Sequence, residues 1–397
     1  MTTEPVAYPF KRPSALDPPK ELADLRKRPA VPVTLPSGDR AVLVTRHEDV
    51  RSVLCDPRVS RNMNRPGAAR ITHGNAMFND ERINPDPPEH TRVRRLVMHT
   101  FSAARVESLR PSVQAIADSL VDTMAAGSPP ADVNEALAFP LSIQVVCELL
   151  GVPGEDRDRF RDWTDAFLSV SRFPPEQIRA SMMELRQYIG DLIEAKRVAP
   201  GEDLISGLIA VHDDDDGRLT EYELHWWTRL LLLVGYETTA TQIAGSVALL
   251  LAHPDQLHAV REDMTLLPGA IEEMLRWKLV GSSVSMLRYV TEDIEVGGEV
   301  IPAGTSVIPA ADSANQDERV FADPWRFDVT RTDNHHLTFS AGPHFCIGAA
   351  LARLELQIAL STLLARFPKL HLGVPPGELR RYEGALLEGF VEVPVAW

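Results

Sequence analysis

The sequence predicts a mainly α-helical protein with small β-sheets. Segments with apolar residues three and four positions apart recur along the chain, which is the spacing of one helix face. Strand-like segments are few and short, and residues 294–308 are interrupted by glycine and proline. With 397 residues and 44% apolar content, the chain can bury a large core. We expect one domain over residues 1–397, with a short flexible segment at about residues 1–20.

The central element is an apolar stretch over residues 224–251, which contains no proline. A membrane span needs about 20 predominantly apolar residues, and here Arg229, Glu237 and Gln242 interrupt the run. We therefore expect a long helix buried inside a helical protein. The same apolar spacing predicts further helices over residues 105–126, 137–150, 175–197, 254–278 and 349–367. Strands are expected within residues 41–45, 294–308 and 391–395.

The charge balance argues against a nucleic-acid or anionic-membrane partner. The net charge is -15, whereas polyanions are bound through clustered lysine and arginine. Residues 1–20 contain several prolines and charges but no apolar segment, so we expect neither a signal peptide nor a membrane anchor. Three widely spaced cysteines suggest neither a disulfide framework nor a Cys-x-x-Cys zinc site. We expect a soluble, cytoplasmic protein.

Cys346 stands directly before an amphipathic helix that begins at Ala349. Free backbone N–H groups and the positive end of the helix dipole at this position lower a thiol's pKa and stabilise thiolate. Gly342 and Gly348 permit tight turns and the close approach of a flat ligand. Cys55 and Cys147 lack this setting, and we interpret them as inert, buried side chains.

The order Phe-x-x-Gly-x-His-x-Cys-x-Gly, from Phe339 to Gly348, resembles the haem-binding signature of the cytochromes P450. The chain is similar to the soluble, actinobacterial-type members over about residues 41–395. The resemblance implies the P450 fold, with haem b between the long central helix and the cysteine loop. It makes Cys346 the ligand of the iron and places Phe339 and Gly348 against the haem. Thiolate ligation favours cleavage of the O–O bond of bound dioxygen.

Two further pairs fit this resemblance. Glu273 and Arg276 match its Glu-x-x-Arg pair, whose implied role is to lock the core on the cysteine side. Glu237 and Thr238 match an oxygen-activation motif, in which an acid and an alcohol relay protons through water. We also expect the Thr238 hydroxyl to bond to the carbonyl of Val234 and loosen the helix there.

The resemblance implies four groups that bind the haem propionates, namely His90, Arg94, Arg288 and His344. Basic groups and donors neutralise carboxylates in partly buried pockets. The chain also departs from the family pattern. The usual proline is missing from residues 281–287, and Gln316 stands where arginine is common, which puts the backbone near the substrate pocket in doubt.

The substrate can be inferred only by region. Regions that line the pocket in the family contain a set of mainly apolar and aromatic side chains, which predicts a medium-sized organic substrate: Met63, Phe78, Phe167, Tyr236, Val284 and Leu387. The resemblance implies a natural-product substrate, from secondary metabolism. The chain contains no Gly-rich dinucleotide fingerprint, so we expect electrons from a ferredoxin and a ferredoxin reductase. Arg92, Arg95 and Arg353 are candidate docking residues.

The sequence is compatible with three functions. A monooxygenase would use dioxygen to hydroxylate or otherwise oxidise its substrate. An oxidative-coupling enzyme of the same fold would join C–C or C–N bonds without inserting oxygen, and its motifs would be identical. A haem-binding sensor or electron carrier would need no proton relay, so Glu237 and Thr238 argue against it.

Overall fold

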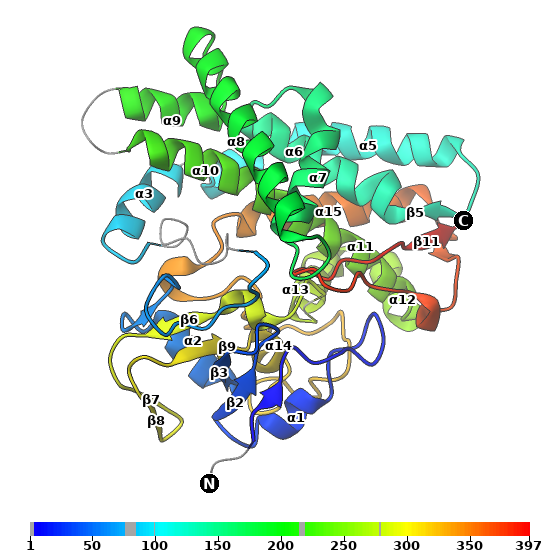
Figure 1. The fold of residues 1–397 in the computed structure, drawn as a ribbon. Helices are drawn as coiled ribbons and strands as arrows, with labels where there is room; N and C mark the ends of the chain where they lie inside the picture. Colours follow the sequence, from blue (N-terminus) through cyan, green and yellow to red (C-terminus); the bar gives the residue numbers. More distant parts are fainter. Residues whose placement is uncertain (1–3, 76–84, 99, 214–218, 278) are drawn as a thin grey trace.

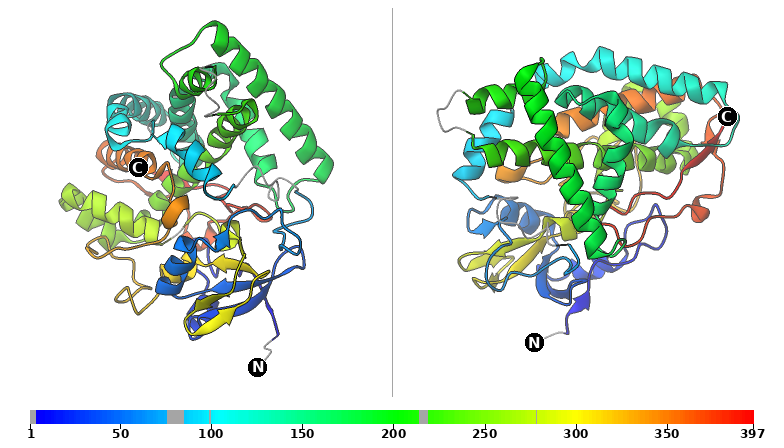
Figure 2. Two further views of the ribbon diagram at one scale, coloured as in Figure 1. Left: turned by 90° about the vertical axis from the view of Figure 1, so that its left-hand side faces the viewer. Right: turned by 45° about the horizontal axis from the view of Figure 1, so that its top comes forward.

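The structure is a computed structural model that describes residues 4–75, 85–98, 100–213, 219–277 and 279–397. Helices dominate, as the sequence predicts. They are α1 Glu21–Leu25, α2 His47–Cys55, α3 Glu89–Met98, α4 Ala103–Ser108, α5 Arg110–Ala126, α6 Phe139–Leu150, α7 Arg157–Phe167, α8 Pro175–Val198, α9 Leu204–Asp213, α10 Glu221–Gly235, α11 Glu237–Leu251, α12 Pro254–Glu262, α13 Leu267–Arg276, α14 Ala311–Ala314 and α15 Ala349–Arg366. Most of these helices gather in one part of the molecule, and the larger sheet occupies another (Figures 1 and 2).

Three predicted helices are each divided in two. The expected helix over residues 224–251 is α10 followed by α11, with Tyr236 between them. Residues 105–126 form α4 and α5, and residues 254–278 form α12 and α13 around a short 3-10 turn. The predictions for α8 and α15 are confirmed to within one residue at each end. Apolar spacing continues across a local break, because both halves pack against the same core.

The strands form one larger sheet and two smaller ones. The larger sheet has the order β1-β2-β3-β9-β6-β4, and the smaller ones are β10-β11-β5 and the hairpin β7-β8. Their bounds are β1 Val6–Ala7, β2 Ala30–Thr34, β3 Arg40–Val44, β4 Val59–Ser60, β5 Ala131–Asp132, β6 Arg288–Val290, β7 Ile294–Val296, β8 Glu299–Ile301, β9 Ser306–Pro309, β10 His371–Leu372 and β11 Pro394–Ala396. Ser60 pairs with Tyr289, so Arg61 and Arg288 lie beside this pairing.

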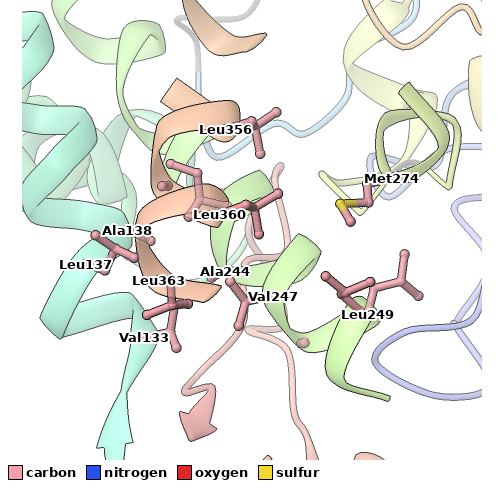
Figure 3. Packing of buried hydrophobic residues seen from close by; sticks show 14 of the residues in the cluster. Val133, Leu137, Ala138, Ala244, Val247, Leu249, Met274, Leu356, Leu360 and Leu363 are labelled. Atoms are coloured by element: carbon pink, nitrogen blue, oxygen red, sulfur yellow. The ribbon is translucent and has the colours of Figure 1, made fainter. Parts of the chain in front are cut away.

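The largest core cluster joins α11 and α15 to the helices around them. Figure 3 shows Ala244 and Val247 of α11 packed near Leu360 and Leu363 of α15, with Leu137 from the segment before α6. Every residue of α11 except Thr238 is buried. This burial explains why the central stretch is almost continuously apolar in sequence. It also makes α11 a rigid support for the site.

Residues 4–20, the described part of the N-terminal segment, pack against the rest of the protein, which corrects the expectation of a flexible segment there. Val6 and Ala7 form β1, which pairs in parallel with β2. Tyr8 is only 3% exposed, and Leu16 is buried in the main core cluster. A proline-rich segment without regular structure reads as flexible from sequence, but its few apolar side chains fasten it to the body.

Within the described ranges, every helix is too short or too polar to cross a membrane.

Candidate active site

A cavity of about 480 Å³ brings together segments from the whole length of the chain. One wall comes from α10 and α11 and contains Trp227, Leu231, Val234 and Thr238, and Cys346 lies in the lining as well. The remaining lining residues come from segments near residues 61–71, 85–94, 167–168, 275, 280–288, 338–347, 352–356 and 386–387. The site is therefore assembled by tertiary packing around a helix pair.

The cavity wall on α10 and α11 follows one helix face. Trp227, Leu231, Val234, Thr238 and Gln242 all line the cavity, at spacings of three and four. Sequence reasoning missed Trp227 and Leu231, although this spacing could have extended the face outward from Thr238.

Tyr236, predicted to shape the substrate pocket, does not belong to the described lining of the cavity. It lies two positions from both Val234 and Thr238, which points its side chain to the other side of the helix. Its hydroxyl donates to the carbonyl of Phe160 at 3.1 Å, so it packs against α7.

The break between α10 and α11 lies beside the cavity. The Thr238 hydroxyl donates to the carbonyl of Val234 at 3.0 Å, as the sequence predicted. Thr239 donates to the carbonyl of Gly235 at 3.4 Å in the same way. These side chains satisfy carbonyls at the end of α10, because the regular backbone bonds are interrupted there. Both threonines also line the cavity, which places two hydroxyl groups at its wall.

Glu237 is buried and faces a group of charges on α7 and the loop after it. Burial is the largest cause that raises the pKa of Glu237 to about 8, and the nearby Asp165 raises it further. Arg161 and Arg172 act in the opposite direction. Arg172 pairs with Asp165 at 3.3 Å, and Arg161 pairs with Glu135 at 2.7 Å. At neutral pH the carboxyl is therefore mostly protonated, so it can donate a proton.

The loop before α15 presents Cys346 to the cavity. Its backbone N–H donates to the carbonyl of Phe339 at 2.8 Å, which closes the loop. Gly342 has a φ of +68°, and a Cβ there would lie 2.7 Å from the carbonyl oxygen of Leu54. Glycine is thus required at this turn.

Desolvation by the surrounding protein is the largest influence on the pKa of the Cys346 thiol and raises it overall, although the side chain is exposed at the cavity. The helix terminus lowers this pKa as predicted, through the N–H of Gly348, and the positive charge of Arg94 acts in the same direction. In the protein alone the thiol form is favoured. A metal ion bound to sulfur would reverse this balance, because a coordinating thiol is deprotonated.

The other two cysteines differ from each other. Cys147 is fully buried in α6, as predicted. Cys55 is exposed at the end of α2, so the prediction that it is buried was wrong.

Five basic groups border the cavity, of which four were predicted from sequence. His90 and Arg94 lie on α3, Arg288 begins β6, and His344 lies in the cysteine loop. Arg61 is the fifth, and sequence reasoning missed it because its place depends on the pairing of β4 with β6. The rings of His90 and His344 lie 4.0 Å apart. Burial, and then neighbouring cations, lower the pKa of His90 to about 4.

This basic group fits a ligand with two carboxylates. The Nδ1 atom of His90 is buried and has no hydrogen-bond partner among the described residues. Burial also lowers the pKa of Arg288 well below its usual value, and nearby Arg61 lowers it further. Arg61, Arg94 and the buried Arg288 border this part of the cavity, and cations gathered in this way are costly unless a bound anion compensates them. Haem propionates would provide this compensation, and Cys346 in the same lining would provide the iron ligand.

The other predicted haem contacts have compatible positions. Phe339 lines the cavity, and the guanidinium of Arg353 lies 4.6 Å from its ring centre. Gly348 is the N-cap of α15, and a Cβ there would meet no described atom within 4 Å. The open space beside Gly348 leaves room for a flat ligand.

Glu273 and Arg276 form a buried ion pair on α13, with both side chains 0% exposed. Two bonds of 2.7 Å join the guanidinium to the two carboxylate oxygens. Arg276 also donates to the carbonyls of Asn315 and Pro324, while Arg331 donates to Glu273 at 3.0 Å. The pair therefore ties α13 to two segments that lead toward the cysteine loop, in agreement with a structural role.

Gln316, the departure from the family pattern, is buried in the same network. Its side-chain oxygen accepts a hydrogen bond from Arg276 at 3.3 Å. A neutral amide at this position places an acceptor, and no second cation, beside the guanidinium.

The predicted substrate residues divide into three groups. Met63, Phe167 and Leu387 line the cavity. Val284 is buried and, like Tyr236, is not part of the described lining. Phe78 lies outside the described residues.

Comparisons with known proteins give a consistent result. A family model described as Cytochrome P450 matches residues 16–376. The chain is 45% identical over 398 residues to nocardicin C N-oxygenase of Nocardia uniformis subsp. tsuyamanensis, covering 100% of this chain and 99% of that protein. It is 43% identical to mycinamicin IV hydroxylase/epoxidase of Micromonospora griseorubida, covering 100% of each chain. A crystal structure of the putative thioether synthase SgvP, involved in the tailoring step of griseoviridin, is similar with a TM-score of 0.95, 41% identity and 100% coverage of each chain.

Proposed function

The chain belongs to the cytochrome P450 family and is a haem-dependent monooxygenase, and on that premise we propose that it oxidises a medium-sized, largely apolar natural product with electrons from a ferredoxin. The observation that carries the proposal is the composition of one cavity. Cys346, Thr238 and an apolar wall that contains Leu231 and Phe167 all face it. An iron ligand, a hydroxyl and a site for an apolar molecule would thus lie together.

Haem bound by a thiolate supplies the chemistry of oxygen activation. The side chains of this chain would perform the remaining tasks. Arg61, Arg94 and Arg288 would hold the propionates, and Cys346 would hold the iron. Thr238 would hold a proton or a water molecule at the cavity wall, and Glu237 would resupply protons from the charged group on α7. The apolar wall would exclude bulk water and orient the substrate.

The wall favours an apolar substrate with a few polar groups. Trp227, Leu230 and Leu231 form a broad apolar surface on α10, while Ser282 and Ser285 supply hydroxyl groups on another segment. The curated relatives act, by their names, on nocardicin C and mycinamicin IV. Large scaffolds with dispersed polar groups would suit such a lining, because a few placed polar groups fix the orientation within an apolar pocket.

Ferredoxin is the proposed electron donor, and it would dock near the cysteine loop. Phe345 is 43% exposed there, and Arg95 on α3 is exposed as well. The other two candidates are engaged, since Arg92 pairs with Glu223 and Arg353 pairs with Glu272. Arg95 is therefore the residue to test first. Arg95→Glu should slow reduction by an acidic ferredoxin more at low salt than at high salt, and an unchanged rate would contradict this docking surface.

The proposed function can be tested first by spectroscopy. Dithionite-reduced protein with carbon monoxide should show the strongly red-shifted Soret band of thiolate-ligated haem, and Cys346→Ala should lose it. Mycinamicin IV, nocardicin C and a wider natural-product collection should then be titrated for low-spin to high-spin shifts. A band typical of histidine ligation, or no haem, would exclude Cys346 as the ligand. A correct band without any spin shift across the collection would contradict the proposed substrate class.

Oxidative coupling is the second candidate. The similarity to a putative thioether synthase supports it, because bond formation between two groups is then a chemistry to consider for this fold. Products made under labelled dioxygen distinguish the two candidates. Label in the product indicates oxygen insertion, and an unlabelled coupled product indicates coupling. A sensor or an electron carrier would give no product.

A further inference from the structure

We propose that Tyr8 is a positioning residue that fastens the N-terminal segment to the cavity wall and thereby sets which substrates fit. This inference rests on the proposed function, since the wall in question belongs to the substrate site. It assigns a specificity role to a segment that lies outside the cavity lining and more than 270 residues away in sequence from the wall it contacts.

The contact is a closed set of hydrogen bonds among Tyr8, Asp312 and Ser283. The Tyr8 hydroxyl donates to Asp312 Oδ2 at 3.0 Å and accepts from the backbone N–H of Ser283 at 3.1 Å. The Ser283 hydroxyl donates to Asp312 Oδ1 at 2.7 Å and accepts from the backbone N–H of Asp312 at 3.1 Å. All three residues are buried. A satisfied polar network in a buried position fixes one geometry, because each lost bond leaves a polar group without a partner.

Ser283 begins a 3-10 turn that forms part of the cavity wall. The turn runs from Ser283 to Met286, and its flanking residue Ser282 lines the cavity together with Ser285, Met286 and Leu287. Val284 lies outside the described lining and belongs to the same hydrophobic cluster as Tyr8. The turn is therefore held from behind while its other residues face the cavity. A shift of Ser283 would move several lining residues together.

The N-terminal segment is also joined, through Arg381, to a second segment that lines the cavity. Arg381 donates to the carbonyl of Ala15 at 2.6 Å and to the carbonyls of Leu279 and Glu388 at 2.6 and 2.7 Å. Residues 386 and 387, which precede Glu388, line the cavity. Thus residues 8–16 are bonded directly to the turn at Ser283 and, through Arg381, to the loop that contains Leu386 and Glu388.

The two walls meet directly at Gly281. Its φ is +55°, and a Cβ there would lie 2.6 Å from the carbonyl oxygen of Leu386 and 3.2 Å from the Cα of Leu387. The backbones are too close for any larger residue. If one of these two segments moved, the other would have to move with it. The N-terminal segment is placed to hold both.

Tyr8→Phe tests the proposal with little change in packing. It removes only the hydroxyl, and the ring keeps its edge contact with Phe10 at 5.5 Å between ring centres. Tyr188→Phe is the matched control. Tyr188 also donates to a carboxylate, Asp156 at 2.9 Å, but it lies on α8 and outside the cavity lining. Ser283→Ala is a second variant, which breaks the same network from the cavity side.

Two measurements on the haem-loaded protein report on the wall. Amide hydrogen exchange in peptides covering residues 281–288 should become faster by about fivefold or more in Tyr8→Phe and Ser283→Ala, because each variant removes two hydrogen bonds of the network. Phenylimidazole and imidazole should then be titrated against the iron. Phenylimidazole extends from the iron toward the walls, so its Kd should change by about fivefold, while the Kd of imidazole should change less than twofold. Tyr188→Phe should change neither measurement.

Unchanged exchange and unchanged affinity in Tyr8→Phe would overturn the proposal. Equal changes for both ligands, accompanied by loss of the red-shifted carbon monoxide band, would also overturn it, because they would indicate a general structural role. The proposed function is judged separately by the wild-type carbon monoxide band. Without that band the function fails, whereas the exchange measurement still decides whether Tyr8 holds the wall.

Discussion

The Thr238 hydroxyl donates to the carbonyl of Val234 at 3.0 Å, and both residues line the cavity at the break between α10 and α11. This bond keeps the hydroxyl beside the cavity and orients its oxygen lone pairs. We infer that a water molecule or a proton held there would be well placed for transfer to bound oxygen.

Thr238→Ala should therefore uncouple electron use from product formation. We expect the yield of product per electron supplied to fall by about tenfold or more, with hydrogen peroxide released instead, because proton delivery becomes less controlled. The measurement compares electrons consumed, peroxide and product in one reaction. Thr238→Ser keeps the hydroxyl and should retain most of the coupling. An unchanged product yield in Thr238→Ala would remove the relay role from Thr238.

Asp165 should control the pH dependence of the reaction through Glu237. The Asp165 carboxylate contributes to the raised pKa of Glu237, so Asp165→Asn should lower that pKa from about 8. The same change frees Arg172 from its ion pair, which favours the charged form of Glu237 further. The alkaline limb of product formation should therefore shift to lower pH. Asp162→Asn, an exposed neighbour on α7, should leave the profile in place, and equal profiles in all three proteins would contradict the coupling.

Loss of Arg276 should prevent stable folding. Glu273 would remain fully buried with a reduced set of partners, and removing one partner of a buried ion pair costs about 3–5 kcal/mol. Arg276→Ala should give little haem-containing protein and a strongly lowered midpoint of thermal unfolding. Arg110→Ala is the control, because Arg110 pairs with Glu107 at the same i,i+3 spacing on the surface, where such pairs contribute about 0–1 kcal/mol. Equal losses in the two variants would contradict the role of burial.

Arg288 should hold haem more strongly than a surface arginine would. It is buried beside the cavity and donates to the carbonyls of Met286 and Leu287 at 2.8 and 3.0 Å. Arg288→Leu removes a charge-assisted contact worth about 1.5–3 kcal/mol, so haem should transfer to apomyoglobin about tenfold to a hundredfold faster. Arg58→Leu removes an arginine that pairs with Asp56 outside the cavity lining and should not change the transfer rate. An unchanged rate in Arg288→Leu would exclude it as a haem contact.

Glu355 should make the stability of the protein fall as pH rises. It is fully buried in α15, and burial raises its pKa to about 8, offset in part by the Ser142 hydroxyl. A folded-state pKa above the unfolded value gives stability that is complete below about pH 4.5 and is lost as the pH rises to about 8. The free energy of unfolding of Glu355→Gln should therefore rise by several kcal/mol relative to that of wild type as the pH goes from 5 to 9. This figure follows from about 1.4 kcal/mol per pKa unit. Urea unfolding at both pH values measures this, and the exposed Glu378→Gln is the control.

The sequence by itself determined the fold class, the cysteine that would bind iron and four of the five basic groups that border the site. These features are local, because the loop from Phe339 to Gly348 and the helix after it form from neighbouring residues. Apolar spacing likewise gave α8 and α15 nearly to their ends, since one face of each helix is buried along its whole length.

Only the tertiary structure decided which side chains share a space. Arg61 joins the basic group through the pairing of β4 with β6, and Tyr8 reaches the wall at Ser283 across the fold. Tyr236 turns away from the cavity although it stands between two lining residues, because direction around a helix changes by about 100° with each residue. Desolvation by segments distant in sequence is the larger influence on the pKa of Cys346 and raises it overall, although the helix end lowers it as predicted. Long-range packing and desolvation depend on segments distant in sequence, and a single sequence does not encode their distances in any local pattern.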